Sequence, residues 1–328
     1  MAISDRAVLD LHLSSFTYPG PEAQLFPTVL RIAGAAERAG FRSVSVMDHL
    51  HQIPPQGAAD EPMLEAYTTL GAIAAHTSNV RLLTIVTDVM LRQPSLLAKQ
   101  VTTLDVISGG RAMLGIGAGG IEDEHHANGI AFPPIGERLR RVEEAVRICR
   151  AMFDGRQSNV EGRYYRTRSA YNLPRPLQTH LPILIGGGGE QRTLRMVAQY
   201  ADLWNVIVYD PETARHKREV LQRHCAAIGR DPASIVKTLY LGVMVVDSSE
   251  QRVGRRLKAI EAAPPPALRG VPAKELGRRL ISGTPERVAE RLRAFIDAGF
   301  DGVSFTVRDA YELDLVALAG QAGKLALS

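Results

Sequence analysis

The stretch Val80–Thr87, VRLLTIVT, followed by Pro94–Ile107, PSLLAKQVTTLDVI, contains one complete strand–helix unit. The first segment is almost continuously apolar and β-branched, which is typical of a strand buried on both faces of a parallel sheet. In the second segment Leu97, Val101 and Leu104 recur at the spacing of one helical face. The two segments together predict a parallel strand and the helix that follows it.

The same alternation of a β-branched run and a helical pattern continues along the chain. Strands are predicted at residues 8–16, 43–49, 80–87, 111–116, 181–185, 202–208, 235–246 and 302–307. Helices are predicted at residues 25–40, 63–76, 94–107, 138–153, 190–200 and 313–325, and two more begin near residues 210 and 284. Eight strands, each followed by a helix, predict an α/β fold, a single (β/α)8 TIM barrel over residues 1–328, although a doubly wound sheet gives the same alternation. Two longer stretches, about 155–175 and 248–282, are interpreted as excursions from the barrel.

The composition excludes several classes of protein. Of the 328 residues 45% are apolar, which is enough for a large core and argues against disorder. Lys and Arg number 39 against 35 Asp and Glu, and the charges are spread along the chain, so no nucleic acid-binding tail is predicted. Cys149 and Cys225 are too few for a disulfide framework or a zinc cluster, and they suit a reducing compartment. Because neither a long apolar run nor a signal-peptide pattern is found, we expect a cytoplasmic protein that does not bind membranes.

The glycines of Gly115–Gly120, GIGAGG, formally match the G-x-G-x-x-G pattern of dinucleotide-binding folds. That fingerprint normally follows the first strand and opens a helix at once. Here it follows the fourth predicted strand and precedes acidic residues, which would repel a pyrophosphate. Two other interpretations stay open: the glycines let a flat ring lie against the backbone, or they only form the tight turns of a strand exit.

A second glycine run, Gly186–Gly189, lies between a predicted strand and a predicted helix. Backbone N–H groups in such a loop, together with the positive end of the helix, can bind a phosphate. Arg192 follows within the first turn and would add a positive charge. The run therefore predicts a phosphate site, with a purely structural loop as the alternative.

The second predicted strand ends at Asp48 and His49. Catalytic groups of a TIM barrel lie at the carboxyl ends of its strands. His49 can exchange a proton near neutral pH, and Asp48 can orient it or contact a polar ring edge. The alternative is a solvated histidine in a loop.

The acidic run Glu122–His126 contains groups that could bind a metal, but it lacks regular ligand spacing, so we interpret it as a solvated turn and predict no metal. The chain also lacks a G-x-S-x-G nucleophile elbow and a G-x-x-x-x-G-K-[ST] phosphate loop. Hydrolase and P-loop functions are therefore disfavoured.

Four of these stretches in combination resemble the bacterial-luciferase-like monooxygenases. They are Met47–His49, Ala98–Arg111, Pro182–Gly189 and Gly283–Glu290, and the similarity extends over nearly the whole chain. The chain is most similar to the branch that uses the deazaflavin coenzyme F420 rather than FMN. The resemblance implies a TIM barrel whose ring-binding site lies at the carboxyl ends of strands one to four.

The resemblance also implies a set of site residues. His49 is the implied catalytic group, which donates or accepts a proton beside the ring, and Asp48 faces the ring as well. Members of the family often have a non-prolyl cis peptide in the third strand. The implied cofactor-binding residues are Asp48, Thr84, Ile85 and Val86 at the ring, Gly117, Ala118, Gly119 and Gly120 at its other edge, and Gly186, Gly187, Gly188, Gly189, Arg192, Asn205 and Val206 on the phosphate side.

One position departs from the family pattern. Some deazaflavin sugar dehydrogenases carry a glutamate that donates a proton at the position of Gly120, which has no side chain to donate. A sugar-phosphate dehydrogenase with the complete acid–base pair is therefore doubtful. Glu122 and Asp123 are the nearby carboxyls that could substitute.

The resemblance implies an oxidoreductase that transfers hydride between C5 of bound F420 and an unidentified organic substrate. The alternatives are an FMN-dependent monooxygenase that works with a partner flavin reductase, and a cofactor-binding barrel without catalytic activity. The substrate is expected above the ring, between the two excursions. Family members are usually dimers, so we expect a homodimer formed by the helices after strands two and three. The alternative to a dimer contact is that the apolar residues of these helices only cover the barrel. These residues are Leu64, Leu70, Ile73, Leu96 and Val101.

Overall fold

The computed structural model describes residues 8–54, 56–155, 157–262, 264 and 280–328. Its centre is a barrel of parallel strands, namely β1 (Val8–Leu13), β2 (Ser43–Val46), β3 (Arg81–Thr84) with the short β4 (Thr87–Asp88), β5 (Leu114–Gly117), β8 (Ile183–Gly186), β9 (Leu203–Ile207), β10 (Val236–Val246) and β12 (Gly302–Val307). The strand order is β3-β2-β1-β12-β10-β9-β8-β5-β4, and a bridge between Leu82 and Ala112 joins its two ends. The TIM barrel is confirmed, and the doubly wound alternative, which leaves a sheet open, is wrong.

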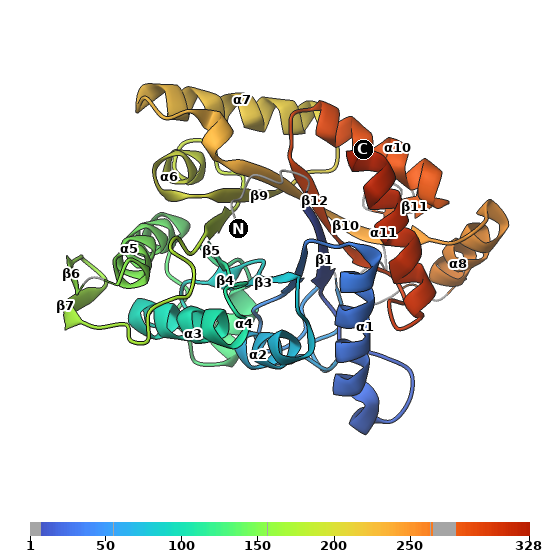
Figure 1. The fold of residues 1–328 in the computed structure, drawn as a ribbon, viewed down its shortest axis with the longest axis horizontal. Helices are drawn as coiled ribbons and strands as arrows, with labels where there is room; N and C mark the ends of the chain where they lie inside the picture. The colour runs from blue at the N-terminus through green and yellow to red at the C-terminus, as the bar shows by residue number, and fades with distance from the viewer. Residues whose placement is uncertain (1–7, 55, 156, 263, 265–279) are drawn as a thin grey trace.

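Helices surround the barrel, as Figure 1 shows. They are α1 (Leu25–Ala39), α2 (Ala66–His76), α3 (Pro94–Ile107), α5 (Ile135–Phe153), α6 (Thr193–Tyr200), α7 (Pro211–Ala227), α10 (Pro285–Asp297) and α11 (Leu313–Leu327). Short 3-10 turns lie at 22–24 and 232–234, and α4 (Glu122–Ala127), α8 (Glu250–Ala262) and β11 (Leu280–Gly283) are additions to the repeating unit.

The ends of the elements follow local sequence signals. α1 ends at Ala39 and is capped by Gly40, whose φ of 89° is left-handed and favours glycine. The side chain of Asp210 caps α7 by accepting a hydrogen bond from the backbone N–H of Thr213 at 2.8 Å. β1 and β2 end three residues earlier than predicted, because the chain leaves the sheet at the mouth of the barrel, and α6 begins at Thr193 rather than at residue 190.

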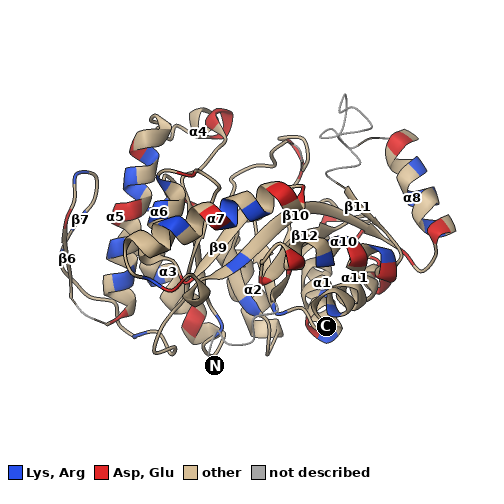
Figure 2. Ribbon diagram, turned by 90° about the horizontal axis from the view of Figure 1, so that it is seen from above, with Lys and Arg blue, Asp and Glu red and all other residues tan. Residues whose placement is uncertain are grey.

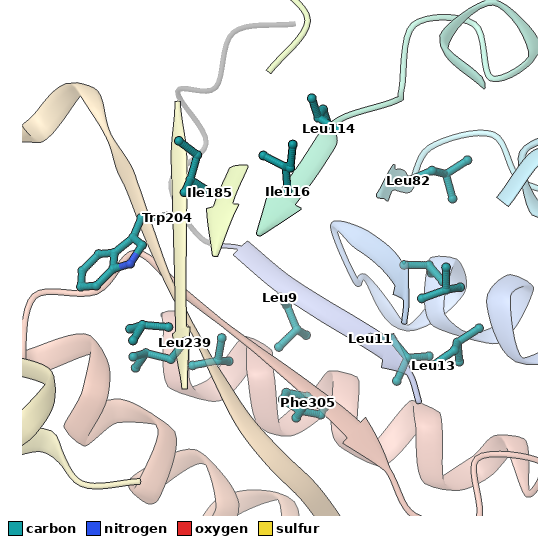
Figure 3. Packing of buried hydrophobic residues seen from close by; sticks show 14 of the residues in the cluster. Leu9, Leu11, Leu13, Leu82, Leu114, Ile116, Ile185, Trp204, Leu239 and Phe305 are labelled. Carbon is teal, nitrogen blue, oxygen red and sulfur yellow. The ribbon is translucent and has the colours of Figure 1, made fainter. Parts of the chain in front are cut away.

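Alternate residues of β1 face different environments. Leu9, Leu11 and Leu13 belong to the large core between the barrel and its helices, part of which Figure 3 shows. Because side chains alternate along a strand, Asp10 and His12 point into the barrel. The amino-terminal end of the barrel interior is closed by an apolar layer of Leu83, Met113, Leu184, Leu203 and Val236.

The excursion at 155–175 is an antiparallel hairpin of β6 (Ser158–Glu161) and β7 (Arg166–Ala170). In Figure 1 it lies at the edge of the molecule, beyond α5 and α3. The Tyr165 hydroxyl anchors it by donating a hydrogen bond to the carbonyl of Val89 at 3.1 Å. The hairpin supplies none of the described residues that line a cavity at the carboxyl ends of β1, β10 and β12, whereas Ile260 and Leu280 of the other excursion do line it. Residues 265–279 of the other excursion lie outside the described residues.

The helices expected to form a dimer contact, α2 and α3, are only partly available. Leu70, Ile73 and Val101 are fully buried against the barrel, whereas Leu96 is 53% exposed. Figure 2 shows Lys, Arg, Asp and Glu along the outer helices. Within the described ranges, no helix has the length and apolar character needed to cross a membrane.

Candidate active site

His49 lies just beyond β2, at the mouth of the barrel, and is held by a buried carboxylate. Its Nδ1 atom is 2.7 Å from Oε2 of Glu124, and the other carboxylate oxygen accepts the backbone N–H of Leu50 at 2.6 Å. A carboxylate only accepts, so Nδ1 of His49 carries the hydrogen. Nε2 then has a free lone pair, and no partner for it is found among the described residues. The His49 side chain is 20% exposed, which leaves Nε2 able to meet a bound molecule.

Glu124 corrects the interpretation of the acidic run as a solvated turn. Glu122 and Asp123 are exposed as expected, but Glu124 and His125 are buried on the inner side of α4. Burial acts to raise the pKa of Glu124, but hydrogen bonds from His49 and two backbone amides outweigh it, so the pKa lies below its ordinary value. Glu124 is therefore a charged partner for His49. The described residues contain no group of side chains arranged to hold a metal.

Asp48 forms an ion pair that the sequence did not reveal. Its two carboxylate oxygens accept hydrogen bonds from Nη1 and Nη2 of Arg92 at 2.6 and 2.9 Å. Arg92 also contacts Glu65 at 2.7 Å, and its guanidinium lies 5.0 Å from the centre of the Tyr67 ring. Both oxygens of Asp48 are thus directed at Arg92, and it is Glu124, not Asp48, that orients His49.

The glycines after strand β5 have unequal roles. A Cβ on Gly117 would lie 2.6 Å from the Val86 side chain, and one on Gly119 would lie 1.9 Å from Oδ2 of Asp88. Gly119 also has a φ of 71°. Ala118 is half-buried, and its carbonyl accepts a hydrogen bond from Arg138 at 3.1 Å. Close packing therefore accounts for Gly117 and Gly119.

Gly120 differs from its neighbours because it is exposed and a Cβ there would meet nothing within 4 Å. The open space beside it is available to a bound molecule. Glu122 and Asp123, the two carboxyls suggested as substitutes, are exposed, and Glu124 is engaged with His49.

The third strand contains the cis peptide that the resemblance implied, between Ile85 and Val86. Both side chains are half-buried and pack on the apolar layer inside the barrel. Thr84 is buried, and its hydroxyl donates to the carbonyl of Gly115 at 3.0 Å. Ile85 and Val86 therefore form a partly exposed apolar floor at the barrel mouth.

Part of the Gly186–Gly189 loop is hydrogen-bonded inside the protein. The amide of Gly187 donates to the carbonyl of Asn205 at 2.9 Å, and the Lys217 ammonium donates to the carbonyl of Gly188 at 3.0 Å. Within the described part of the chain no acceptor is found for the amides of Gly188 and Gly189. These two N–H groups can still bind an anion.

Other residues assigned to the phosphate side are spread around this loop. The guanidinium of Arg192 points to the start of α5, where Nη1 lies 3.4 Å from the carbonyl of Gly136. The side chain of Asn205 turns into the barrel and donates to the Thr238 hydroxyl at 3.0 Å. It is therefore the backbone carbonyl of Asn205 that faces the loop. Val206 is buried and would lie 3.0 Å from a Cβ on Gly188.

A cavity of about 330 Å³ opens at the carboxyl ends of β1, β10 and β12. Its wall includes His12 and Ser14 from β1 and the segment after it, Tyr240 from β10, and Thr306 from β12. Such a cavity at the carboxyl face of a TIM barrel is the default position for a substrate.

Sequence comparison agrees with this geometry. The profile of the luciferase-like monooxygenase family matches residues 11–302. The chain belongs to this family. It is accordingly an oxidoreductase enzyme with the barrel fold of that family.

Individual relatives extend over most of the chain. An uncharacterized protein of Mycobacterium tuberculosis is 32% identical over 213 residues, which cover 61% of this chain and 74% of that protein. An F420-dependent glucose-6-phosphate dehydrogenase of Kineococcus radiotolerans is 28% identical over 291 residues, which cover 82% and 84% of the two chains. The structure of an EDTA monooxygenase from Chelativorans sp. matches with a TM-score of 0.81 at 20% identity, covering 96% of this chain and 93% of that one, a likeness of fold.

Proposed function

We propose that this protein is an F420-dependent oxidoreductase that transfers hydride between the deazaflavin and an organic alcohol or carbonyl compound. The observation that carries the proposal is the His49–Glu124 pair at the barrel mouth, with Nε2 of His49 unpartnered among the described residues. Oxidation of an alcohol releases a proton together with the hydride, so it needs an acid–base group beside the substrate. The similarity to an F420-dependent dehydrogenase over 82% of the chain supports the choice of cofactor.

The residues at the mouth fit such a cofactor. Ile85 and Val86 offer a flat apolar surface, and the space beside Gly120 is open. The free amides of Gly188 and Gly189 would hold a phosphate. When bound, F420 supplies the carbon that accepts or donates the hydride, and the protein binds the ring, positions the substrate and excludes water.

His49 handles the proton in this proposal. In the oxidation direction Nε2 accepts the proton of the substrate hydroxyl, and the resulting imidazolium is stabilised by the Glu124 carboxylate at 2.7 Å. In the reduction direction the same proton returns to the substrate oxygen. Glu124 acts as a positioning residue, because it fixes the ring orientation and the tautomer of His49.

The test is a screen of alcohols, aldehydes and ketones with F420, read by the absorbance of the oxidised deazaflavin. We expect turnover of a substrate by the wild-type enzyme, and a reduction of about 10²–10⁴-fold in the His49→Ala variant. The alternative, an FMN-dependent monooxygenase with a partner reductase, predicts substrate-dependent oxygen consumption with reduced FMN and no turnover with F420. That result would replace the proposal.

A further inference from the structure

The interior of this barrel is polar on the side of β1, which is unusual because bulky branched apolar residues normally dominate that position. The buried carboxylate of Asp10 is surrounded by three hydroxyls. Ser43 donates to Oδ1 at 2.6 Å, and Ser45 and Ser304 donate to Oδ2 at 2.6 and 2.5 Å. Asp10 is thus a carboxyl group held inside the barrel without a basic partner among its hydrogen-bonding residues.

Ser45 connects Asp10 to His12. The Nδ1 atom of His12 lies 2.9 Å from the Ser45 hydroxyl oxygen. The single hydrogen of Ser45 is donated to Asp10, so the hydrogen of the second bond must come from Nδ1 of His12. Neutral His12 therefore carries its hydrogen on Nδ1, and Nε2 has a lone pair.

His12 is the end of this chain of hydrogen bonds that faces the cavity. It lines the 330 Å³ cavity at the carboxyl ends of β1, β10 and β12, and the Tyr240 ring contacts it edge-on with ring centres 5.1 Å apart. In the described part of the chain, no hydrogen-bond partner is found for Nε2. A substrate oxygen in the cavity can therefore meet this atom.

The pKa values of His12 and Asp10, the two ends of this chain of hydrogen bonds, are shifted in opposite directions. Burial, with a smaller electrostatic contribution from His49, lowers the pKa of His12 to about 3. Burial raises the pKa of Asp10, although its three serine hydrogen bonds act against this. The groups that face His12 are Asp10 through Ser45, His49 and the Tyr240 ring. His12 therefore resists an extra proton, and Asp10 is the better place to store one.

We propose that Asp10, Ser45 and His12 form a buried proton relay that opens on the cavity and supplies a second acid–base group for the reaction. The proposal rests on the proposed function, because it needs an alcohol or carbonyl substrate. His12 would be the catalytic residue, and Ser45 and Asp10 act through it.

In the relay, each group that gives up a proton receives another, except Asp10, which keeps the one it receives. When the substrate oxygen lies in this cavity, its O–H bond breaks in alcohol oxidation, and its single proton moves to Nε2 of His12 in place of Nε2 of His49. The Nδ1 proton moves to the Ser45 oxygen, and the Ser45 proton moves to Oδ2 of Asp10. With F420 bound, the deazaflavin would accept the hydride that the substrate carbon gives up. His12 begins and ends neutral, with its hydrogen shifted from Nδ1 to Nε2, and reduction of a carbonyl runs the same steps backwards.

Nitrogen-15 NMR of the histidine side chains tests the relay without any cofactor. The His12 signals are assigned by their loss in His12→Gln. At neutral pH we expect neutral His12 with the hydrogen on Nδ1. On acidification, protonation of Asp10 should move that hydrogen to Nε2 without forming an imidazolium. A His12 that is an imidazolium at neutral pH would overturn the proposal.

Two serine variants provide a matched comparison. Ser45→Ala removes the connection, so the His12 tautomer should no longer follow Asp10. Ser43→Ala removes a different hydroxyl from Asp10 and should leave the wild-type Nδ1–H tautomer in place. If both variants behave alike, the connection through Ser45 is wrong. Ser45→Thr, which keeps the hydroxyl, should restore the wild-type response if Ser45→Ala proves unstable.

The kinetic test follows once a substrate is found. His12→Gln should lower kcat by about 10²–10⁴-fold. Ser45→Ala should lower kcat with little change in KM, and Ser43→Ala should affect kcat less. Wild-type kcat in His12→Gln would contradict the relay even if F420 binds. Failure to bind F420 would contradict the proposed function and leave the NMR result on the relay standing by itself.

Discussion

The Glu124→Gln substitution probes the unit that fixes His49. In the wild-type protein the buried carboxylate accepts hydrogen bonds from Nδ1 of His49 at 2.7 Å and from the Leu50 amide at 2.6 Å. A glutamine keeps one acceptor oxygen for Leu50 but presents an NH2 group to Nδ1. His49 must then give up its hydrogen at Nδ1 or move away from residue 124, and either change removes the free base at Nε2 or its orientation.

The size of the effect follows from the hydrogen bond between His49 and Glu124 that the substitution removes. One charge-assisted hydrogen bond contributes about 1.5–3 kcal/mol, so the free energy of unfolding should fall by that amount. Turnover should fall by about 10²–10⁴-fold, because the imidazolium no longer has its carboxylate partner and the tautomer is wrong. Urea unfolding measures the first effect, and steady-state kinetics with F420 and the substrate found in the screen measures the second.

Glu122→Gln is the matched control. Glu122 belongs to the same short helix, but its side chain is 63% exposed and its nearest histidine contact is His126 at 3.9 Å. Glu122→Gln should leave the free energy of unfolding unchanged within about 0.5 kcal/mol, and it should leave turnover unchanged within about twofold. Wild-type turnover in Glu124→Gln, or equal losses in both variants, would refute the assignment of Glu124 as the partner of His49.

Four further predictions use other parts of the molecule. Gly188→Asp should abolish cofactor binding in a folded protein, because it adds a negative charge beside the free amides; Gly187→Asp is a poorer probe, since the φ of 122° at Gly187 is strained for any side chain. His49→Ala should lose turnover while His51→Ala stays active, because Nδ1 of the His51 ring is engaged with the neighbouring Gln52 carbonyl, at 3.0 Å. Acid unfolding should be less steep in His12→Gln. The pKa of His12 falls from 6.5 to about 3 on folding, so the unfolded chain binds the extra proton, and wild-type stability drops by up to about 1.4 kcal/mol per pH unit between those values. Sedimentation should show a dimer that Leu96→Glu weakens, since Leu96 is 53% exposed on α3; a stable wild-type monomer would refute the association.

The barrel could be predicted because each strand is a short β-branched run and each helix has a clear apolar face. The position of His49 could also be predicted, since it follows a strand at the face where barrel enzymes place their catalytic groups. Glu124 could not be predicted, because a six-residue helix is too short for its pattern to show which side is buried. Arg92 could not be predicted either, because its contact with Asp48 joins residues 44 apart in the sequence.

The polar interior of the barrel has a visible signal in the first strand. Asp10, His12 and Ser14 alternate with leucines, which is unexpected for a strand buried on both faces. Their partners Ser43, Ser45 and Ser304 come from β2 and β12, and only the register of the barrel brings them to Asp10. The position of the 155–175 hairpin was similarly unpredictable, because it depends on contacts of Tyr165 outside the barrel.

The most direct test of the proposed function is a pair of binding titrations. Purified protein is titrated separately with F420 and with FMN, each followed by quenching of the cofactor's fluorescence, and the Gly188→Asp variant serves as the control for the phosphate loop. We predict saturable binding of F420, much weaker binding of FMN, and loss of F420 binding in Gly188→Asp. Tight binding of FMN with no binding of F420 would contradict the account.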